Sequence, residues 1–503
     1  MYTKQGETPE NLNDEQSRAA MLATVGTSYI QGGIKRTVLE KTDFNDGLTV
    51  NLNLIEVPNG TSAAPHTHPG LEVTYVLEGE FDLVTEGRPD RRFAPGMTYV
   101  VADGDIHYAR AVANVRSPLL TAAALSLGAA VALGLTRFSY GLLLPPMRED
   151  LGWSYLLAGS MNTYNALGYF VGALITPALM RRAGVWRLLM VGAVSASLIM
   201  MVAAALSSPV ALAAQRLAAG IASALLFIAG GVLAARLGSQ HSERAGLMIG
   251  LYYGGTGIGI ALSALLVPAA LGAAQRHGAT HAWQWPWLML GAACLLASAL
   301  MAWPARTIGE AAPATMQARR FAVGDFTFAL SAYFMFGVGY IGYMTFVVAL
   351  LKQQGMRADL ITWFYTLLGL AVVASSRIWA RMLDRYKGGE SLAVLNVLLG
   401  VVTMLPALTS AVPVAFVSGL VFGAVFLSVV ASTTALVRHN LPQPAWSAGI
   451  SAFTTAFAAG QIVGPSLTGW IADGPAGLER GLLASAATLF MGAALAWRQK
   501  PLT

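Results

Sequence analysis

The stretch PLLTAAALSLGAAVALGLTRFSYGLLLPPM, residues 118–147, contains one charged side chain, Arg137. A helix needs about 20 apolar residues to cross about 30 Å of hydrocarbon, and this run is longer. Because lipid offers the backbone no hydrogen-bond partners, such a segment must be helical. Eleven similar runs follow, at 155–180, 187–207, 209–237, 245–272, 283–303, 321–351, 360–383, 391–409, 412–437, 446–472 and 478–497. The sequence therefore predicts twelve membrane-spanning helices in a lipid bilayer.

Upstream of this stretch the composition changes. Residues 1–116 hold 10 Lys and Arg against 16 Asp and Glu, a net charge of −6, whereas residues 117–503 hold 22 against 10, a net of +12. The whole chain is 55% hydrophobic and 12% charged, about half the charged share of an ordinary soluble domain. We expect a soluble acidic module followed by a membrane protein. The basic surplus belongs to the membrane part and gives no reason to invoke nucleic acid.

The location of the two ends follows from charge and from the N-terminal residues. One set of alternate helix connections holds fourteen Lys and Arg and the other set holds five, and the richer set should be cytoplasmic. An even number of helices then predicts that both termini are cytoplasmic, in a bacterial-type inner membrane. The stretch MYTKQGETPENLNDEQ lacks the apolar core of a secretory signal, which agrees. The lone Cys294 excludes an intrachain disulfide.

The membrane part contains an internal repeat. Residues 203 positions apart match at Gly134 and Gly337, Arg182 and Arg385, Gly257 and Gly460, and Ser263 and Ser466. A constant offset over several helices indicates two six-helix repeats in the same orientation. We expect a first half over 117–308, a central cytoplasmic loop over 309–320 and a second half over 321–503.

With this organisation, the chain resembles the major facilitator superfamily over about 117–500. That family carries a Gly-x-x-x-Asp-Arg-x-Gly signature after its second helix and a degenerate copy after its eighth. Asp384 and Arg385 match the second copy, whereas the first has Arg181 where Asp is usual, followed by Arg182. Residues 134–147 and 460–473 look like the YbfB/YjiJ-type branch. The resemblance implies facilitated or ion-coupled transport of a small solute, with the signature residues in gating.

Two arginines lie deep in the predicted helices. Arg137 and Arg216 each fall roughly 10–18 Å from the external surface at 1.5 Å of rise per residue. A buried charge costs several kcal/mol and marks a pathway, and a planar guanidinium suits a carboxylate. The alternative is that both bond backbone carbonyls in a structural role. Further pathway candidates are Asn162, Tyr164, Asn165, Tyr169 and Gln461. We expect the solute to be a small organic anion.

The soluble module has the pattern of strands. Residues 48–54, LTVNLNL, alternate between apolar and polar, and residues 73–84 do so on either side of Gly79. We predict an all-β barrel over 45–116, after an acidic leader and an opening strand over 1–44. The only histidines of the module are His66, His68 and His107, and Glu72 lies four residues after the second. These four suit one divalent transition metal: Zn, Fe, Mn, Ni or Cu.

The spacing around these residues is similar to that of the cupin family. Gly60, His66, His68, Glu72 and Gly79 fit the first cupin motif, and Gly96, Gly104 and His107 fit the second, in which Ala102 and Ala111 replace Pro and Asn. The resemblance implies a double-stranded β-helix of the jelly-roll class, with the three histidines and Glu72 as metal ligands.

Two functions stay open for this module, because cupins include both binding proteins and enzymes. The module is either a sensor or regulatory domain of the transporter, or a membrane-tethered metalloenzyme such as a dioxygenase or isomerase. We assign no catalytic residue, and the oligomeric state stays open.

Overall fold

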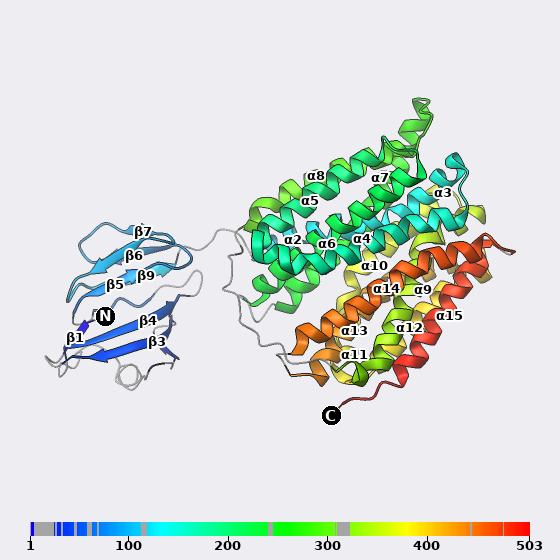
Figure 1. Ribbon diagram of the computed structural model, residues 1–503. Coiled ribbons are helices and arrows are strands. Elements are labelled where there is room, and N and C mark those ends of the chain that lie inside the picture. The colour runs from blue at the N-terminus through cyan, green and yellow to red at the C-terminus, as the bar shows by residue number, and fades with distance from the viewer. Residues whose placement is uncertain are drawn as a thin grey trace. The chain divides into compact units, whose positions relative to one another are not determined.

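The computed structural model describes residues 2–4, 25, 28–31, 34–44, 48–57, 63–67, 70–111, 118–239, 245–306, 308, 322–442, 445–475 and 477–502. The chain divides into two compact units, Met1–Ser117 and Pro118–Thr503. Strands make up the first unit and helices make up the second (Figure 1). This division confirms the predicted change from an all-β module to an all-α membrane domain.

The first unit contains three antiparallel sheets within its described residues. One has the strand order β1-β4-β3-β2, from Tyr2–Lys4, Leu48–Glu56, Ile34–Asp43 and Ser28–Gln31. The second pairs β5, Glu72–Tyr75, with β8, Thr98–Val101. The third has the order β7-β6-β9, from Arg91–Phe93, Phe81–Thr85 and His107–Ala111. Val76, Leu83, Phe93 and Val101 form a small core, against which the rings of Phe81 and Tyr99 pack.

The range 1–44 contributes more strands than the single opening strand that we expected. It supplies β1, β2 and β3, all in the sheet that contains β4. The longest of them, β3, buries only Ile34 and Val38. Its sequence therefore lacks the alternation of apolar and polar residues by which a strand is recognised. Gly79 and Gly104 have φ angles of 78° and 76°, so the tight turns of the motifs need glycine at these positions.

Each of the twelve predicted membrane runs is helical in the second unit, with ends shifted by a few residues. The first run is α2, Pro118–Ala129, a π-helix, Ala130–Phe138, and α3, Tyr140–Leu151. The others in the first half are α4 Tyr155–Ala183, α5 Val185–Ala203, α6 Pro209–Ser239, α7 Ala245–Arg276 and α8 Gln284–Arg306. The second half contains a short 3-10 turn, Val323–Phe326, α9 Thr327–Gln353, α10 Ala358–Ile378, α11 Ala380–Arg385, α12 Glu390–Leu408, α13 Val412–Asn440, α14 Trp446–Ala472 and α15 Gly477–Trp497.

Two of the predicted runs are not continuous α-helices. The first changes to π-helix over Ala130–Phe138, and the eighth ends at Ile378 and resumes as α11. At the second break the indole of Trp379 donates to the carbonyl oxygen of Ala424 on α13, over 2.9 Å. This bond fixes the side chain at the point where α10 ends.

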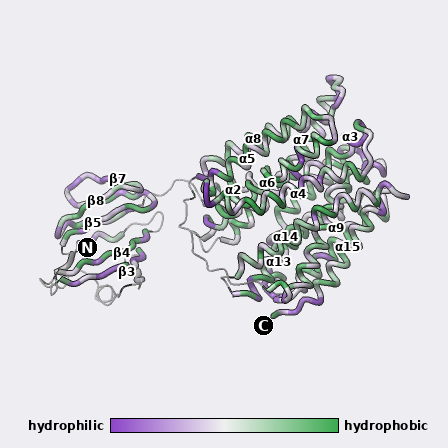
Figure 2. Tube along the Cα trace, viewed as in Figure 1, coloured by the Kyte–Doolittle hydropathy of each residue, from purple (hydrophilic) through white to green (hydrophobic). Residues whose placement is uncertain are grey.

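The helix starts agree with the internal repeat. α4 and α10 begin at Tyr155 and Ala358, and α6 and α13 begin at Pro209 and Val412, both at the predicted offset. Ten spans among the described helices are long and apolar enough to cross a membrane. α4 and α14 are not among the ten, because polar residues interrupt them (Figure 2). These two less apolar helices pack against each other across the two halves.

Candidate transport pathway and metal site

The π-helix of the first run sits where α7 comes very close. A Cβ atom on Gly134 would lie 2.5 Å from the Cα atom of Gly259, so both positions need glycine. Its bonds span five residues: the hydroxyl of Thr136 donates to the carbonyl of Val131, and the backbone nitrogen of Ser139 donates to the carbonyl of Gly134. Wider turns of this kind are frequent at functional sites.

Arg216 on α6 is held in place by this segment and by α4. Its Nη1 donates to the carbonyl oxygen of Thr136 over 2.9 Å, and its Nη2 donates to Oδ1 of Asn162 over 3.1 Å. The guanidinium carbon lies 5.0 Å from the ring centre of Tyr140 and 5.6 Å from that of Trp287. Arg216 therefore connects three helices. This agrees with the alternative that it has a structural role.

Arg137 differs from Arg216 in its surroundings. Its side chain is 2% exposed, yet its Nε and Nη2 atoms have no hydrogen-bond partner among the described residues. The guanidinium carbon lies 5.8 Å from the ring centre of Tyr169. Arg137 directly follows Thr136, whose carbonyl binds Arg216, so the two like charges lie on adjoining segments. A buried charge with unused donors is costly, and an anion would offset that cost.

The unused atoms of Arg137 form one edge of the guanidinium fork. Elsewhere in this chain the same edge holds a carboxylate: Nε and Nη2 of Arg357 donate to the two carboxylate oxygens of Asp359, over 3.1 and 2.8 Å. The geometry of Arg137 therefore suits a carboxylate bound by two parallel hydrogen bonds.

The other predicted pathway residues have unequal surroundings. Asn162 contacts Arg216 and also donates to the hydroxyl of Thr345 in the second half, over 2.9 Å. Asn165 donates to the backbone carbonyl of Arg216. The amide of Gln461 donates to the hydroxyl of Tyr340 on α9. Tyr164 is 39% exposed, whereas the other four candidates are at most 9% exposed.

The two halves are bonded to each other at the end of the bundle where α3 ends and α4 begins. The carboxylate of Asp473, at the end of α14, accepts hydrogen bonds from the backbone nitrogens of Tyr155 and Leu156, over 2.6 and 2.9 Å. A carboxylate at a helix N-terminus is favourable because the helix dipole is positive there. Lys352 on α9 pairs with Glu149 on α3 over 2.7 Å.

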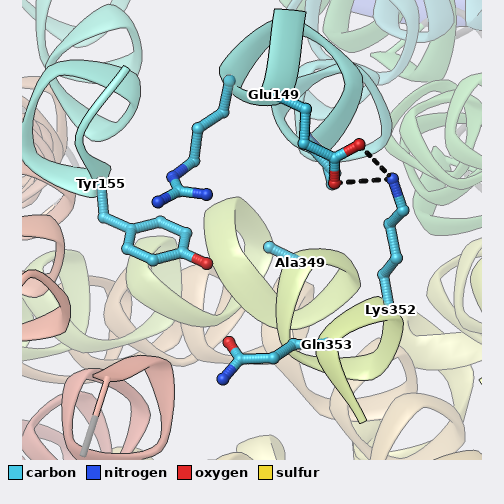
Figure 3. A pocket seen from close by; sticks show the side chains of 7 residues that line it. Glu149, Tyr155, Ala349, Lys352 and Gln353 are labelled. Carbon is cyan, nitrogen blue, oxygen red and sulfur yellow. Dashed lines mark hydrogen bonds and ion pairs between the residues drawn. The ribbon is translucent and has the colours of Figure 1, made fainter. Parts of the chain in front are cut away.

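A pocket of about 260 Å³ lies between the halves at this same end (Figure 3). Its lining comprises Pro145, Arg148, Glu149, Tyr155, Ala349, Lys352 and Gln353. The guanidinium carbon of Arg148 lies 3.8 Å from the ring centre of Tyr155. Sequence reasoning did not select these residues or the Asp473 contact as functional, because partners such as Tyr155 and Asp473 are 318 positions apart and no local pattern joins them.

The loop signature residues lie on the surface. Arg181 and Arg182 end α4, Asp384 and Arg385 end α11, and all four are exposed. The ion pairs found between described residues include none of the four. Their expected role in gating therefore stays a prediction.

In the first unit, three of the four predicted metal ligands lie among the described residues, and His107 lies against each of the other two. His66 and His107 exchange two backbone hydrogen bonds of 3.1 and 3.0 Å, and their ring centres are 4.6 Å apart. Nε2 of His107 lies 3.5 Å from a carboxylate oxygen of Glu72. His68 lies outside the described residues, and within those residues no three His, Cys, Asp or Glu side chains form a metal-binding group.

Hydrogen bonds to backbone carbonyls fix the tautomers of both described histidines. Nδ1 of His66 lies 2.9 Å from the carbonyl oxygen of Ala64, and Nδ1 of His107 lies 3.0 Å from that of Asp105. Because a carbonyl oxygen can only accept, each Nδ1 carries a proton; Nε2 offers a lone pair when the ring is neutral, and in protonated His107 it donates to Glu72. Metal-binding histidines in proteins are oriented in this way.

Glu72 is also oriented by its neighbours. Its Oε1 accepts hydrogen bonds from the hydroxyls of Thr74 and Tyr99, over 2.8 and 3.3 Å. Burial lowers the pKa of His107, but hydrogen bonding to Glu72 and to the carbonyl of Asp105 outweighs it, so the pKa is raised. Burial and the nearby Glu72 charge raise the pKa of Tyr99, which stays a neutral donor. The residues present are therefore compatible with a metal bound by nitrogen and oxygen.

Comparisons with known proteins agree with both units. Residues 129–497 match the family described as uncharacterised MFS-type transporter YbfB, and residues 53–120 match the cupin domain family. No curated protein matches the chain. Among solved structures, a bacterial homolog of the human lysosomal transporter Spinster, inward-facing and unoccupied, aligns with a TM-score of 0.59 at 14% identity, covering 76% of this chain and 96% of that one. The nucleoside transporter NupG aligns with a TM-score of 0.58 at 13% identity, covering 76% and 100%. These likenesses show the fold.

Proposed function

The chain belongs to the MFS-type transporter family described by YbfB, and on this premise we propose that it carries a small organic anion across a membrane by facilitated or ion-coupled transport. The chain is a multi-pass integral membrane protein with a cupin domain at its N-terminal end. The observation that carries the proposal is Arg137, which is buried and whose Nε and Nη2, on one edge of the guanidinium group, have no hydrogen-bond partner among the described residues.

The distribution of carboxylates supports an anionic solute. Every carboxylate among the described residues of the second unit lies at or near the end of a helix: Glu149, Asp150, Asp325, Asp359, Asp384, Glu390, Asp473 and Glu479. A cation would therefore meet no described counter-charge near Arg137. A carboxylate would instead reduce the repulsion between Arg137 and Arg216. Arg216 keeps a positioning role in this proposal, because it holds the carbonyl of Thr136, next to Arg137.

We assign the cupin unit a cytoplasmic sensor or regulatory role. Its metal would be held by His66, His68, Glu72 and His107, and it would supply a Lewis-acidic centre for a bound oxygen ligand. Glu72 is engaged by two hydroxyl donors and by His107, which suits metal binding better than proton transfer. This arrangement favours ligand binding over the enzymatic alternative.

Cysteine labelling tests the predicted orientation. In a Cys294→Ser background, cysteines at Thr280 and Ala358 should react with a membrane-impermeant reagent added outside the cell. Cysteines at Leu39 and Ala314 should react only after the membrane is opened. The asymmetry of fourteen to five basic residues predicts that the first pair lies outside and the second pair inside. Labelling of Leu39→Cys from outside in intact cells would contradict both the topology and the internal sensor role.

Binding by the purified full-length protein tests the preference for anions. In thermal-shift measurements, small carboxylates should raise the melting temperature, because a ligand that binds only the folded state stabilises it. The matching carboxamides have nearly the same shape without the charge and should leave the melting temperature unchanged. Equal shifts from acids and amides would refute an anion site.

A further inference from the structure

Five aromatic rings in the second half form a cluster that we name the aromatic wall: Tyr333, Phe336, Tyr340, Phe426 and Phe457. Tyr340 and Phe426 have ring centres 5.7 Å apart and planes 8° apart, and Phe336 and Phe457 are 5.4 Å and 12° apart. Tyr340 and Phe457 are 5.5 Å and 20° apart. Rings from three helices, α9, α13 and α14, therefore share nearly one orientation.

Tyr343 and Phe422 are also nearly parallel, at 18°, but other ring pairs of the described bundle meet edge to face. Phe364 and Phe416 meet at 83°, Phe138 and Phe426 at 84°, and Tyr155 and Phe346 at 78°. Edge-to-face contacts of this kind are an ordinary way to fill a core. Offset-stacked rings are equally common in cores, and they present their faces in one direction, which suits a flat aromatic partner.

The aromatic wall lies beside Arg137. The ring of Phe138, the residue after Arg137, has its centre 5.8 Å from that of Phe426 in the wall, and the hydroxyl of Tyr340 accepts a hydrogen bond from Gln461. Tyr340 is 1% exposed and Phe336 is fully buried, whereas Phe457 is only partly buried. Of the five rings, Phe457 is the one that is not buried, so it is the ring of the wall with surface left for a ligand.

We propose that the transported anion is aromatic: its carboxylate binds Nε and Nη2 of Arg137 in the first half, and its flat ring lies against Phe457 of the aromatic wall in the second half. This inference rests on the proposed anion transport and names its substrate class. A ligand held in this way contacts both halves, and sites between the two repeats are where transporters of this architecture bind their substrates.

Pairs of acids that differ only in ring saturation test the inference. The purified full-length protein is titrated with benzoate and cyclohexanecarboxylate, and with 2-naphthoate and its decahydro counterpart. Each aromatic acid should bind about threefold to tenfold more tightly than its saturated partner, the range that aromatic pairing provides. Phe457→Leu should bring this ratio close to one, and Phe457→Tyr, which keeps a ring, should retain it.

Phe416→Leu is the matched control. Phe416 is also partly buried on a helix of the second half, but it packs edge-on against Phe364, outside the aromatic wall. This variant should keep the wild-type ratio. Equal affinity of the wild type for aromatic and saturated acids, or an unchanged ratio in Phe457→Leu, would overturn the aromatic inference alone. Failure to bind any carboxylate, or wild-type binding by Arg137→Ala, would count against the anion site itself.

Discussion

Replacing Arg137 with alanine is expected to abolish anion uptake while the protein stays folded. Removing one partner of a buried, hydrogen-bonded charge pair costs about 2–5 kcal/mol, so affinity should fall by a factor of about 30 or more. Arg137→Lys should keep part of the activity, because an ammonium supplies the charge without the fork that binds a carboxylate through two bonds. Uptake by reconstituted variants, at equal amounts of inserted protein, measures both effects.

Two further arginines separate binding from folding in this experiment. Arg216→Ala should lower the melting temperature, because the carbonyl of Thr136 and the amide of Asn162 lose a buried donor. Arg377→Ala is the control, since Arg377 is exposed in the last turn of α10. It should transport like the wild type. If a properly folded Arg137→Ala variant transports anions at the wild-type rate, Arg137 has only a structural role.

Replacing His107 with alanine is expected to remove the metal from the cupin unit. His107 is 3% exposed and lies against both Glu72 and His66, so its loss should reduce metal from about one ion per chain to a trace. Elemental analysis of the purified full-length protein measures this content. His277→Ala is the control, because His277 stacks on Trp285 in the second unit. It should keep the wild-type content. An unchanged content in His107→Ala, or a wild type without metal after growth in supplemented medium, would refute the site.

Tyr99→Phe provides a milder test of the same site. The change removes the hydroxyl that donates to Glu72 but keeps the ring that packs against Phe81 and Phe93. Groups that orient a metal ligand typically contribute about 10-fold to 100-fold in metal affinity. We expect a weaker dissociation constant within that range and an unchanged fold. Competition with a chelator of known affinity measures it.

The membrane helices could be predicted from the sequence because the signal is local. A run such as 118–147 is apolar over its full length, and its helical state follows from the absence of water in lipid. The π-helix within that run could not be predicted in the same way. It coincides with the close approach of Gly134 to Gly259 and with the bond from Arg216 to Thr136, contacts between residues 80 positions apart or more.

The candidate site shows the same limit. Sequence reasoning selected Arg137 and Arg216 together, because both are charges deep in apolar runs. Their neighbours distinguish them: both terminal nitrogens of Arg216 donate, to Thr136 and Asn162, and only its Nε has no described partner, whereas Nε and Nη2 of Arg137 both lack one. In the cupin unit, motif spacing identified His66, Glu72 and His107, and His107 lies against each of the other two, while their binding of a metal stays a prediction. His68 lies outside the described residues, so its part in the ligand set stays a prediction.

Flux of a carboxylate and of its carboxamide into proteoliposomes tests the central claim most directly. Purified full-length protein is reconstituted, and initial rates are measured for paired compounds such as benzoate and benzamide, against protein-free vesicles. The account predicts saturable, protein-dependent uptake of the acid anion, with only the passive rate for the amide. Saturable uptake of the amide at the rate of the acid, or no protein-dependent flux of any carboxylate, would contradict it.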